Sequence, residues 1–228
     1  LMNLAVRLVS PDTFVTLAGK NNIPNFDAAF LGFRQGKLGN QVLIGELAPL
    51  FRRHYFLYDT DITGTALRCL RRGIRTEEER RLMVELQDEV VGQKEKNYLR
   101  IIDSIRQSGD EGQKIFIFGA PYQFKELCEV MAGHNRKPAL RKGSLVLFGG
   151  GWKSFTGEAM DRDSLVNLLT DTLEIPPHMV MEGYSMTEIN MLMLRCRHGR
   201  FHIPPVIEPV ISDRELGPLE GTDIRGVF

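Results

Sequence analysis

The sequence predicts an α/β fold in which a parallel sheet is flanked by helices, with a small β-rich segment towards the C-terminal end. Three apolar runs carry this prediction, at residues 114–118, 145–148 and 179–183. Each run has the length and apolar character of a strand buried in a parallel sheet. Helix-length segments separate the three runs, so the order is that of repeated βα units. We expect helices on both faces of this sheet.

The overall composition is that of a globular α/β protein. The chain has 228 residues, 43% of them hydrophobic, and its 29 basic and 29 acidic residues give a formal net charge of zero. This balance argues against nucleic acid or an anionic membrane as the main partner, because both are bound through clustered positive charge. Three scattered cysteines do not form a disulfide framework, and neither a membrane-spanning run nor a signal peptide is visible. We therefore expect a cytoplasmic location.

The first part of the chain has weaker patterns. Residues 4–9 form an apolar run before a proline, which predicts a strand. Residues 26–50 contain four glycines among mixed side chains, so we expect a loose region with a short helix at most. Residues 54–58 are rich in aromatic side chains and precede polar capping residues, a pattern typical of a strand followed by a helix.

Two helical stretches are predicted before the first of the three buried strands. Apolar residues at positions 66–70 indicate a helix that ends at Gly73, since glycine adopts the left-handed conformation found at helix ends. Thr76 and Glu79 fit a capping box at the start of a long helix. Gly92 predicts a break or kink in that helix, which then continues to residues 108–110.

The remaining elements complete a single predicted domain. Apolar residues with helical spacing occur at residues 124–133 and 161–173. After residue 188 the runs become short and are divided by glycine and proline, which predicts antiparallel strands or an irregular flap. Because no internal linker is visible, residues 1–228 are interpreted as one domain that is cut at both ends.

The turns after the predicted strands contain residues that could bind a ligand. Carboxyl ends of neighbouring parallel strands meet at one edge of a sheet, which is where ligands bind in open α/β folds. Gly149, Gly150 and Gly151 have no Cβ atoms, so a planar ring can lie directly on their backbone. A tight turn after the strand is the simpler explanation of the glycines alone. Tyr184 offers an aromatic face to a heteroaromatic base, or is only a tyrosine on the rim.

Three polar residues beside these turns are candidates for phosphate chemistry. The Thr187 hydroxyl can donate to a phosphate oxygen, and the Glu188 carboxylate is the kind of oxygen ligand that Mg²⁺ prefers. The same pair also suits the start of a helix, with Thr187 as its cap and Glu188 near the helix dipole. Lys153 can pair with a phosphate or a carboxylate, although a lysine after a turn is usually only solvated.

A second candidate site is a segment with metal-ligand side chains. Cys196, His198 and His202 bring one thiol and two imidazoles within seven residues, which suits part of a zinc site. No further group with metal-ligand spacing is nearby, so a hairpin with locally bonded histidines is the alternative. The dinucleotide-binding glycine motif, a complete Walker loop and a Gly-x-Ser-x-Gly elbow are all missing from the sequence, which argues against those enzyme classes.

These features together resemble a known enzyme family. Residues 183–188, Gly-Tyr-Ser-Met-Thr-Glu, resemble the Tyr-Gly-x-Thr-Glu motif of the adenylate-forming superfamily, which includes acyl-CoA synthetases. Within it, the Gly-Gly-Gly-Trp-Lys run at residues 149–153 and the segment at residues 196–205 look like the acyl-protein synthetase family of the LuxE type. The resemblance extends over most of the chain from residue 50 onward.

The resemblance implies a two-step reaction that uses ATP and Mg²⁺. A carboxylic acid, here a fatty acid, is activated as an acyl-adenylate and then passed to a thiol acceptor, either a protein cysteine or CoA. Tyr184 would stack on adenine, Thr187 would touch the α-phosphate and Glu188 would hold Mg²⁺, with Thr187, Glu188 and Lys153 as the catalytic candidates. The nucleotide-binding residues would be Gly149, Gly150, Gly151, Tyr184, Ser185, Met186 and Thr187.

The chain departs from the family pattern in two ways. Ser185 stands where the motif usually has glycine, and the phosphate-binding loop and the C-terminal lid domain with its catalytic lysine are expected outside residues 1–228. We therefore expect a partial adenylation domain that is inactive alone. Two alternatives stay open: a CoA ligase resembling phenylacetate-CoA ligase, and a catalytically silent nucleotide-binding module. The oligomeric state is not predicted.

Overall fold

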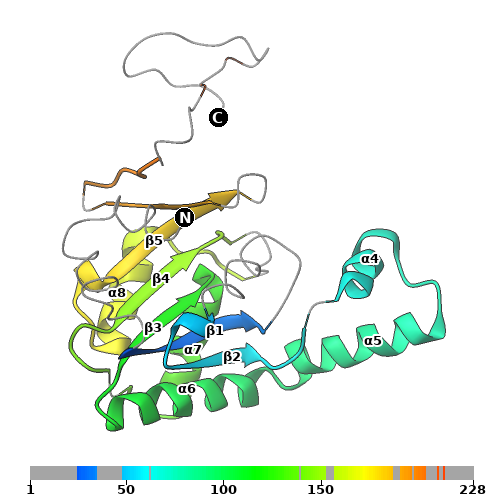
Figure 1. Ribbon diagram of the computed structural model, residues 1–228, viewed down its shortest axis with the longest axis horizontal. Coiled ribbons are helices and arrows are strands. Elements are labelled where there is room, and N and C mark those ends of the chain that lie inside the picture. Colours follow the sequence, from blue (N-terminus) through cyan, green and yellow to red (C-terminus); the bar gives the residue numbers. More distant parts are fainter. Residues whose placement is uncertain are drawn as a thin grey trace.

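Among the residues that the structure describes, six strands form a central sheet with the order β2-β1-β3-β4-β5-β6 (Figure 1). The computed structural model describes residues 25–34, 48–61, 63–138, 140–152, 157–186, 191–196, 198–203, 210 and 213. The strands are β1 (Phe26–Phe33), β2 (Arg53–Tyr58), β3 (Lys114–Gly119), β4 (Leu145–Gly149), β5 (Val180–Met186) and β6 (Met191–Leu194). Neighbouring strands are parallel, except that β6 runs antiparallel to β5. The predicted α/β class is confirmed.

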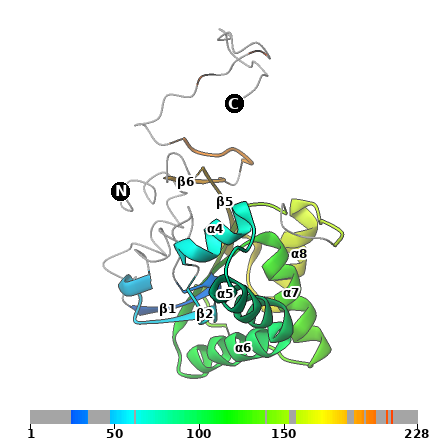
Figure 2. The same ribbon diagram turned by 90° about the vertical axis from the view of Figure 1, so that its right-hand side faces the viewer.

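The long helices pack on one face of the sheet. They are α6 (Lys94–Asp110), α7 (Pro121–Gly133) and α8 (Arg162–Leu173), and Figure 2 shows them on the same side. Their inward side chains join strand residues in a buried cluster that includes Tyr98, Ile101, Phe124, Leu127, Val146, Phe148, Leu165 and Leu169. On the opposite face, Ala48 and Phe51 pack against strand side chains. In the described part of the chain, the expected helical cover is therefore present on one face.

Two shorter helices leave the sheet and form a projecting arm. Figure 1 shows α4 (Gly64–Arg72) and the first part of α5 (Glu77–Gln87) beyond the strands. As predicted, α4 ends at Gly73, which has φ +80°. Thr76 caps α5 by accepting from the amide of Glu79, whose carboxylate accepts from the amide of Arg75 at 2.8 Å.

The predicted break at Gly92 takes the form of a short π-helical segment. This segment, η4 (Asp88–Gly92), joins α5 to α6. A π-helical turn inserts an extra residue into the helical ladder, so the chain continues with a changed direction of its apolar stripe. Two 3-10 turns, η3 (Ala48–Leu50) and η5 (Pro177–Met179), precede β2 and β5.

The prediction of a loose region at residues 26–50 is wrong for its first third. Phe26–Phe33 is β1, which lies between β2 and β3 and is buried from Phe26 to Leu31. Its small side chains, Ala28 and Ala29, and the charge of Asp27 disguise the continuous apolar run that is typical of a central parallel strand. The strand predicted at residues 4–9 lies outside the described residues.

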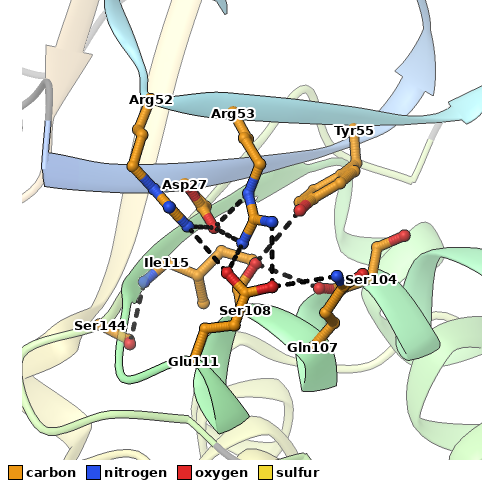
Figure 3. A network of polar contacts seen from close by, with 10 residues as sticks. All are labelled: Asp27, Arg52, Arg53, Tyr55, Ser104, Gln107, Ser108, Glu111, Ile115 and Ser144. Atoms are coloured by element: carbon orange, nitrogen blue, oxygen red, sulfur yellow. Dashed lines mark hydrogen bonds and ion pairs between the residues drawn. The ribbon is translucent and has the colours of Figure 1, made fainter.

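The charge of Asp27 is neutralised at the amino edge of the sheet (Figure 3). Its fully buried carboxylate accepts from Arg52 Nε at 2.9 Å and from Arg53 Nη2 at 2.9 Å. Arg53 Nη2 also donates to Glu111 at 2.6 Å, which connects the strands to the end of α6. This network lies at the end of the sheet opposite to the predicted site.

Further expectations from the sequence concern cysteines and membranes. The three cysteines are free, with Cys69 and Cys128 buried and Cys196 partly exposed. Within the described ranges, none of the helices has both the length and the apolar character needed to cross a bilayer.

Candidate functional site

The predicted rim forms where β3, β4 and β5 end side by side. Gly119 at the end of β3 is paired with Phe148, and Gly149 at the end of β4 is paired with Gly183 of β5. The ends of these three strands therefore lie at one edge of the sheet, and the turns that follow β3 and β4 leave the sheet there. This part of the sequence prediction rested on strand order, and the three strands are neighbours in that order.

The glycines after β4 have a backbone role that the sequence left open. A Cβ on Gly149 would lie 2.5 Å from the carbonyl oxygen of Gly183, so the two strand ends approach closer than any side chain permits. Gly150 and Gly151 adopt φ of +90° and +69°, which favours glycine. The glycines thus make the turn itself, and they also leave the backbone at this edge free of side chains. Trp152, which follows them, is half-buried against the helix-side core.

Tyr184 lies near the end of β5 with its ring at the surface. Its residue exposure is 43%, and its ring centroid is 6.0 Å from that of Phe201 at an interplanar angle of 59°. Ser185 and Met186 continue β5 and pair with Leu192 and Met191 of β6. The serine that departs from the motif's glycine therefore occupies an extended strand.

A charged cluster on β5 connects this strand to its neighbours. The Glu182 carboxylate accepts from Arg162 Nε at 3.0 Å and from Arg195 Nη1 at 2.8 Å. Arg162 is the first residue of α8, and Arg195 directly follows β6. The side chain of Glu182 is 23% exposed, so the cluster is partly shielded from solvent. This cluster is not apparent from the sequence, because its members are 13 and 20 residues apart along the chain.

The segment after β6 forms a tight hairpin. The Cys196 amide donates to the carbonyl of Arg200 at 2.9 Å, and Arg195 forms a β-bridge with Phe201. Hydrogen bonds from the backbone of Arg200 and from the side chain of His202 lower the pKa of the Cys196 thiol to about 7.

The hairpin bears on the zinc prediction. Cys196 and His202 lie in contact, whereas among the residues that the structure describes no three His, Cys, Asp or Glu side chains converge as metal ligands. The alternative interpretation, a hairpin with local hydrogen bonds, matches the geometry of this segment. A zinc role for Cys196, His198 and His202 stays a prediction.

The catalytic candidates Lys153, Thr187 and Glu188 lie outside the described residues. Their neighbours are described: Trp152 follows the glycine turn and Met186 ends β5. Phe201 is an aromatic residue near Tyr184 that was not predicted from the sequence. The signal that could have found it is the alternation of side chains along paired strands, which requires the β5–β6 register.

A hollow of about 720 Å³ lies away from this rim, between the helices of the arm. Its walls are mostly polar, and they are formed by Thr63, Thr65, Thr76, Glu78, Glu79, Arg81, Leu82 and Glu85. Of these, Glu79 is already bonded to Arg72 and to the amide of Arg75. None of the predicted site residues belongs to this hollow.

Comparison with known proteins gives a consistent set of relatives. Residues 92–219 match the family model described as acyl-protein synthetase, LuxE. The long-chain-fatty-acid–luciferin-component ligase of Vibrio harveyi is 26% identical over 120 residues, which cover 52% of this chain and 31% of that protein. The ligase of the same name from Aliivibrio fischeri is 27% identical over 120 residues, covering 48% of this chain and 32% of that protein. The match thus spans about a third of the length of these relatives.

Solved structures with partial similarity include two described as bound to ATP. An RpMatB-BxBclM chimera has a TM-score of 0.40 and 13% identity, with 97% of this chain and 33% of that chain covered. MatB from Rhodopseudomonas palustris has a TM-score of 0.38 and 14% identity at the same coverage.

Proposed function

Because this chain belongs to the acyl-protein synthetase LuxE family, whose model matches more than half of its residues, we propose that it forms part of an ATP-dependent enzyme that activates a carboxylic acid. The substrate class that we propose is a fatty acid, in keeping with the names of the two bacterial relatives. The acid is joined to AMP and then transferred to a thiol.

One observation carries this proposal. The glycine turn after β4 and Tyr184 of β5 meet at one edge of the sheet, where Gly149 and Gly183 are paired. The motif residues Thr187 and Glu188 follow β5 within two residues. A surface aromatic ring beside a backbone edge without side chains suits a planar base, whose polar atoms backbone groups can recognise.

The proposed roles follow from this placement and from the family motif. Tyr184 stacks on adenine, while Gly149, Gly150 and Gly151, with Ser185 and Met186, border the nucleotide. Thr187 donates to the α-phosphate, and Lys153 offers a positive charge to the same region. Mg²⁺, held by Glu188, would neutralise charge on the phosphates of ATP.

The proposed chemistry balances in two steps. A carboxylate oxygen of the acid attacks the α-phosphorus of ATP, and the bond from that phosphorus to the oxygen bridging to the β-phosphate breaks. The products are acyl-adenylate and pyrophosphate. A thiolate then attacks the acyl carbon, and AMP leaves with the former carboxylate oxygen, so that a thioester remains. The protein's contribution is mainly to hold the reactants in line and to balance charge.

The chain corresponds to the central part of a larger adenylation domain in this proposal. The match covers about a third of each relative, and the phosphate loop and the lid domain with its lysine would belong to other parts of the protein. We propose a cytoplasmic location and a protein cysteine as the acyl acceptor. CoA is the alternative acceptor, and a silent nucleotide-binding module is the alternative from a different class.

Carboxylate-dependent exchange of pyrophosphate into ATP tests the proposal in the full-length protein. We expect exchange with long-chain fatty acids, and we expect Glu188→Ala to reduce it by about 100-fold or more because the metal ligand is lost. Glu129→Ala, which removes an exposed carboxylate on α7, is the matched control and should leave the rate unchanged.

The same assay separates the alternatives. If the protein binds ATP but exchanges pyrophosphate with none of a set of carboxylic acids of different chain length, the silent module is supported and the enzyme is contradicted. Following a labelled acyl group then identifies the acceptor: label on protein supports the acyl-protein synthetase, and label on CoA supports the CoA ligase.

A further inference from the structure

We propose that Phe201 is a second aromatic residue of the nucleotide site, and that Glu182 and Arg195 are positioning residues that hold its ring beside Tyr184. The inference rests on the proposed function, since it assumes that the base of ATP stacks on Tyr184. It adds a contact that lies outside the Tyr-Gly-x-Thr-Glu motif and that neither the motif nor the names of the relatives assign.

The strand register places these four side chains on one face. Side chains alternate along a strand, so Glu182 and Tyr184 of β5 point to the same side of the sheet. The Arg195 amide donates to the carbonyl of Glu182 at 2.9 Å, which sets Arg195 opposite Glu182. Phe201 is in turn the bridge partner of Arg195. Glu182 of β5 and the bridged pair Arg195 and Phe201 of the hairpin therefore form a row, with Tyr184 next to it.

Polar contacts fix the middle member of this row. Arg195 donates through Nη1 to Glu182 at 2.8 Å and through Nε to the carbonyl of Gly199 at 3.0 Å. Its guanidinium carbon lies 5.9 Å from the centre of the Phe201 ring, within the range of a cation–π contact. Because two hydrogen bonds hold the planar guanidinium in place, the Phe201 ring packs against it in a defined position.

The hairpin backbone limits how far Phe201 can move. Besides the Cys196 to Arg200 hydrogen bond, the His202 amide donates to the carbonyl of Leu194 at 3.1 Å. Gly199 makes the turn with φ +76°. The backbone of Phe201 is thus held by hydrogen bonds on both sides of its bridge to Arg195, a suitable support for a binding residue.

The aromatic pair is open at the surface. Phe201 is 38% exposed and Tyr184 is 43% exposed, although their ring centroids are only 6.0 Å apart. At an angle of 59° the two rings form a corner, in which a base stacked on one ring meets the edge of the other. Neighbouring exposed aromatic rings on a rigid edge are typical of surfaces that bind planar ligands.

ATP affinity and exchange kinetics of the full-length protein test this inference. Phe201→Ala should raise the dissociation constant of ATP, measured by calorimetry, by about 5-fold, the usual effect of losing one edge-to-face aromatic contact. The KM for ATP should rise similarly, while the KM for the acid stays unchanged. Phe201→Tyr keeps an aromatic face and should restore affinity, whereas Phe201→Leu keeps apolar packing and should not.

A second pair of variants tests the positioning role of Arg195. Arg195→Lys keeps the charge but loses the planar group beneath Phe201, so the KM for ATP should rise several-fold. Arg162→Lys alters the other partner of Glu182, which lies at the start of α8 and outside the hairpin, and should change the KM for ATP by less than about twofold.

The outcomes separate this inference from the proposed function. Unchanged ATP affinity in Phe201→Ala overturns the inference even when acid-dependent exchange is intact. Equal losses in Phe201→Ala and Phe201→Tyr, or in Arg195→Lys and Arg162→Lys, also overturn it, because they indicate general damage to the hairpin. ATP binding without exchange contradicts the enzyme, and the calorimetric comparison still tests Phe201.

Discussion

At the scale of single residues, the buried carboxylate of Asp27 shows how neighbouring side chains keep an acidic group ionised. Burial alone would raise the pKa of Asp27, but hydrogen bonds from Arg52 and Arg53 outweigh it and hold the pKa below its ordinary value. The pKa of Glu111 is also lowered, chiefly by its hydrogen bond from Arg53. The ionised network therefore favours the folded state (Figure 3).

Replacing Asp27 tests this network. Asp27→Asn removes the buried carboxylate that Arg52 and Arg53 share and leaves them the more exposed carboxylate of Glu111, so we expect it to lower the free energy of unfolding by about 3 kcal/mol. Urea unfolding followed by circular dichroism measures the change. Asp110→Asn removes an exposed partner of Arg106 at 3.7 Å and should cost less than about 0.5 kcal/mol. Equal effects of the two variants would contradict a stabilising role for the network.

The same network predicts a dependence of stability on pH. Because the folded pKa values of Asp27 and Glu111 lie below their unfolded values, their contribution is fully present above about pH 5. It is lost as the pH falls from there through the folded pKa values. Unfolding midpoints measured between about pH 7 and about pH 3 should therefore decline more steeply for the wild type than for Asp27→Asn. A parallel decline in both proteins would show that other groups dominate.

Among the residues, a position near the end of a strand is easier to predict from the sequence than the partner of a side chain. Gly149 and Tyr184 each follow or end an apolar run, which marks them in the sequence, and both lie at the rim. Asp27 falls in a stretch predicted to be loose, because the groups that stabilise its charge inside the strand are far away in the sequence, among them arginines 25 and 26 residues away. Phe201 was missed for a related reason, since its place beside Tyr184 depends on strand pairing.

At the scale of elements, the close approach of β4 and β5 defines the rim. A Cβ at Gly149 would meet the carbonyl oxygen of Gly183 at 2.5 Å, and backbone atoms have little freedom to move away. We expect Gly149→Ala to destabilise the protein by about 2 kcal/mol and to weaken ATP binding, because the strand ends must separate.

A matched glycine provides the control for this prediction. A methyl group added to Gly133, at the end of α7, would meet no heavy atom within 4 Å beyond the adjoining helix backbone, so Gly133→Ala should stay within about 0.5 kcal/mol of the wild type. Thermal unfolding and ATP calorimetry on both variants measure the difference. Gly149→Ala with wild-type stability and affinity would contradict the close approach as a requirement of the site.

The elements with a clear period were predictable and those without it were not. The βα units from β3 to β5 follow the predicted order, because short apolar runs alternate with helical stripes there. The helix break at Gly92 was also found, as a π-helical segment. In contrast, β1 has alanines and a charge in place of large β-branched residues. Its burial therefore became apparent only from its pairing with β2 and β3 in the structure.

At the scale of the whole molecule, the two ends of the sheet carry different kinds of side chain. The amino edge carries the Asp27 network, in which acidic side chains and arginines form ion pairs with one another. The carboxyl edge carries the glycine turn, the exposed aromatic pair and the start of the family motif. Ligand binding at the carboxyl ends of strands is the general arrangement in open α/β sheets. This arrangement fits the membership of the acyl-protein synthetase family. The fold alone does not identify a function, so the sequence motif was needed as well.

Photoaffinity labelling shows where the base of ATP binds, and we expect it to bind at the carboxyl rim of the sheet. The full-length protein is irradiated with 2-azido-ATP, and the modified residues are located by mass spectrometry. We expect labelling on the segments that hold Tyr184 and Phe201, and we expect excess ATP to suppress it. Labelling that ATP suppresses but that lies only elsewhere, such as in the hollow between α4 and α5, would contradict it.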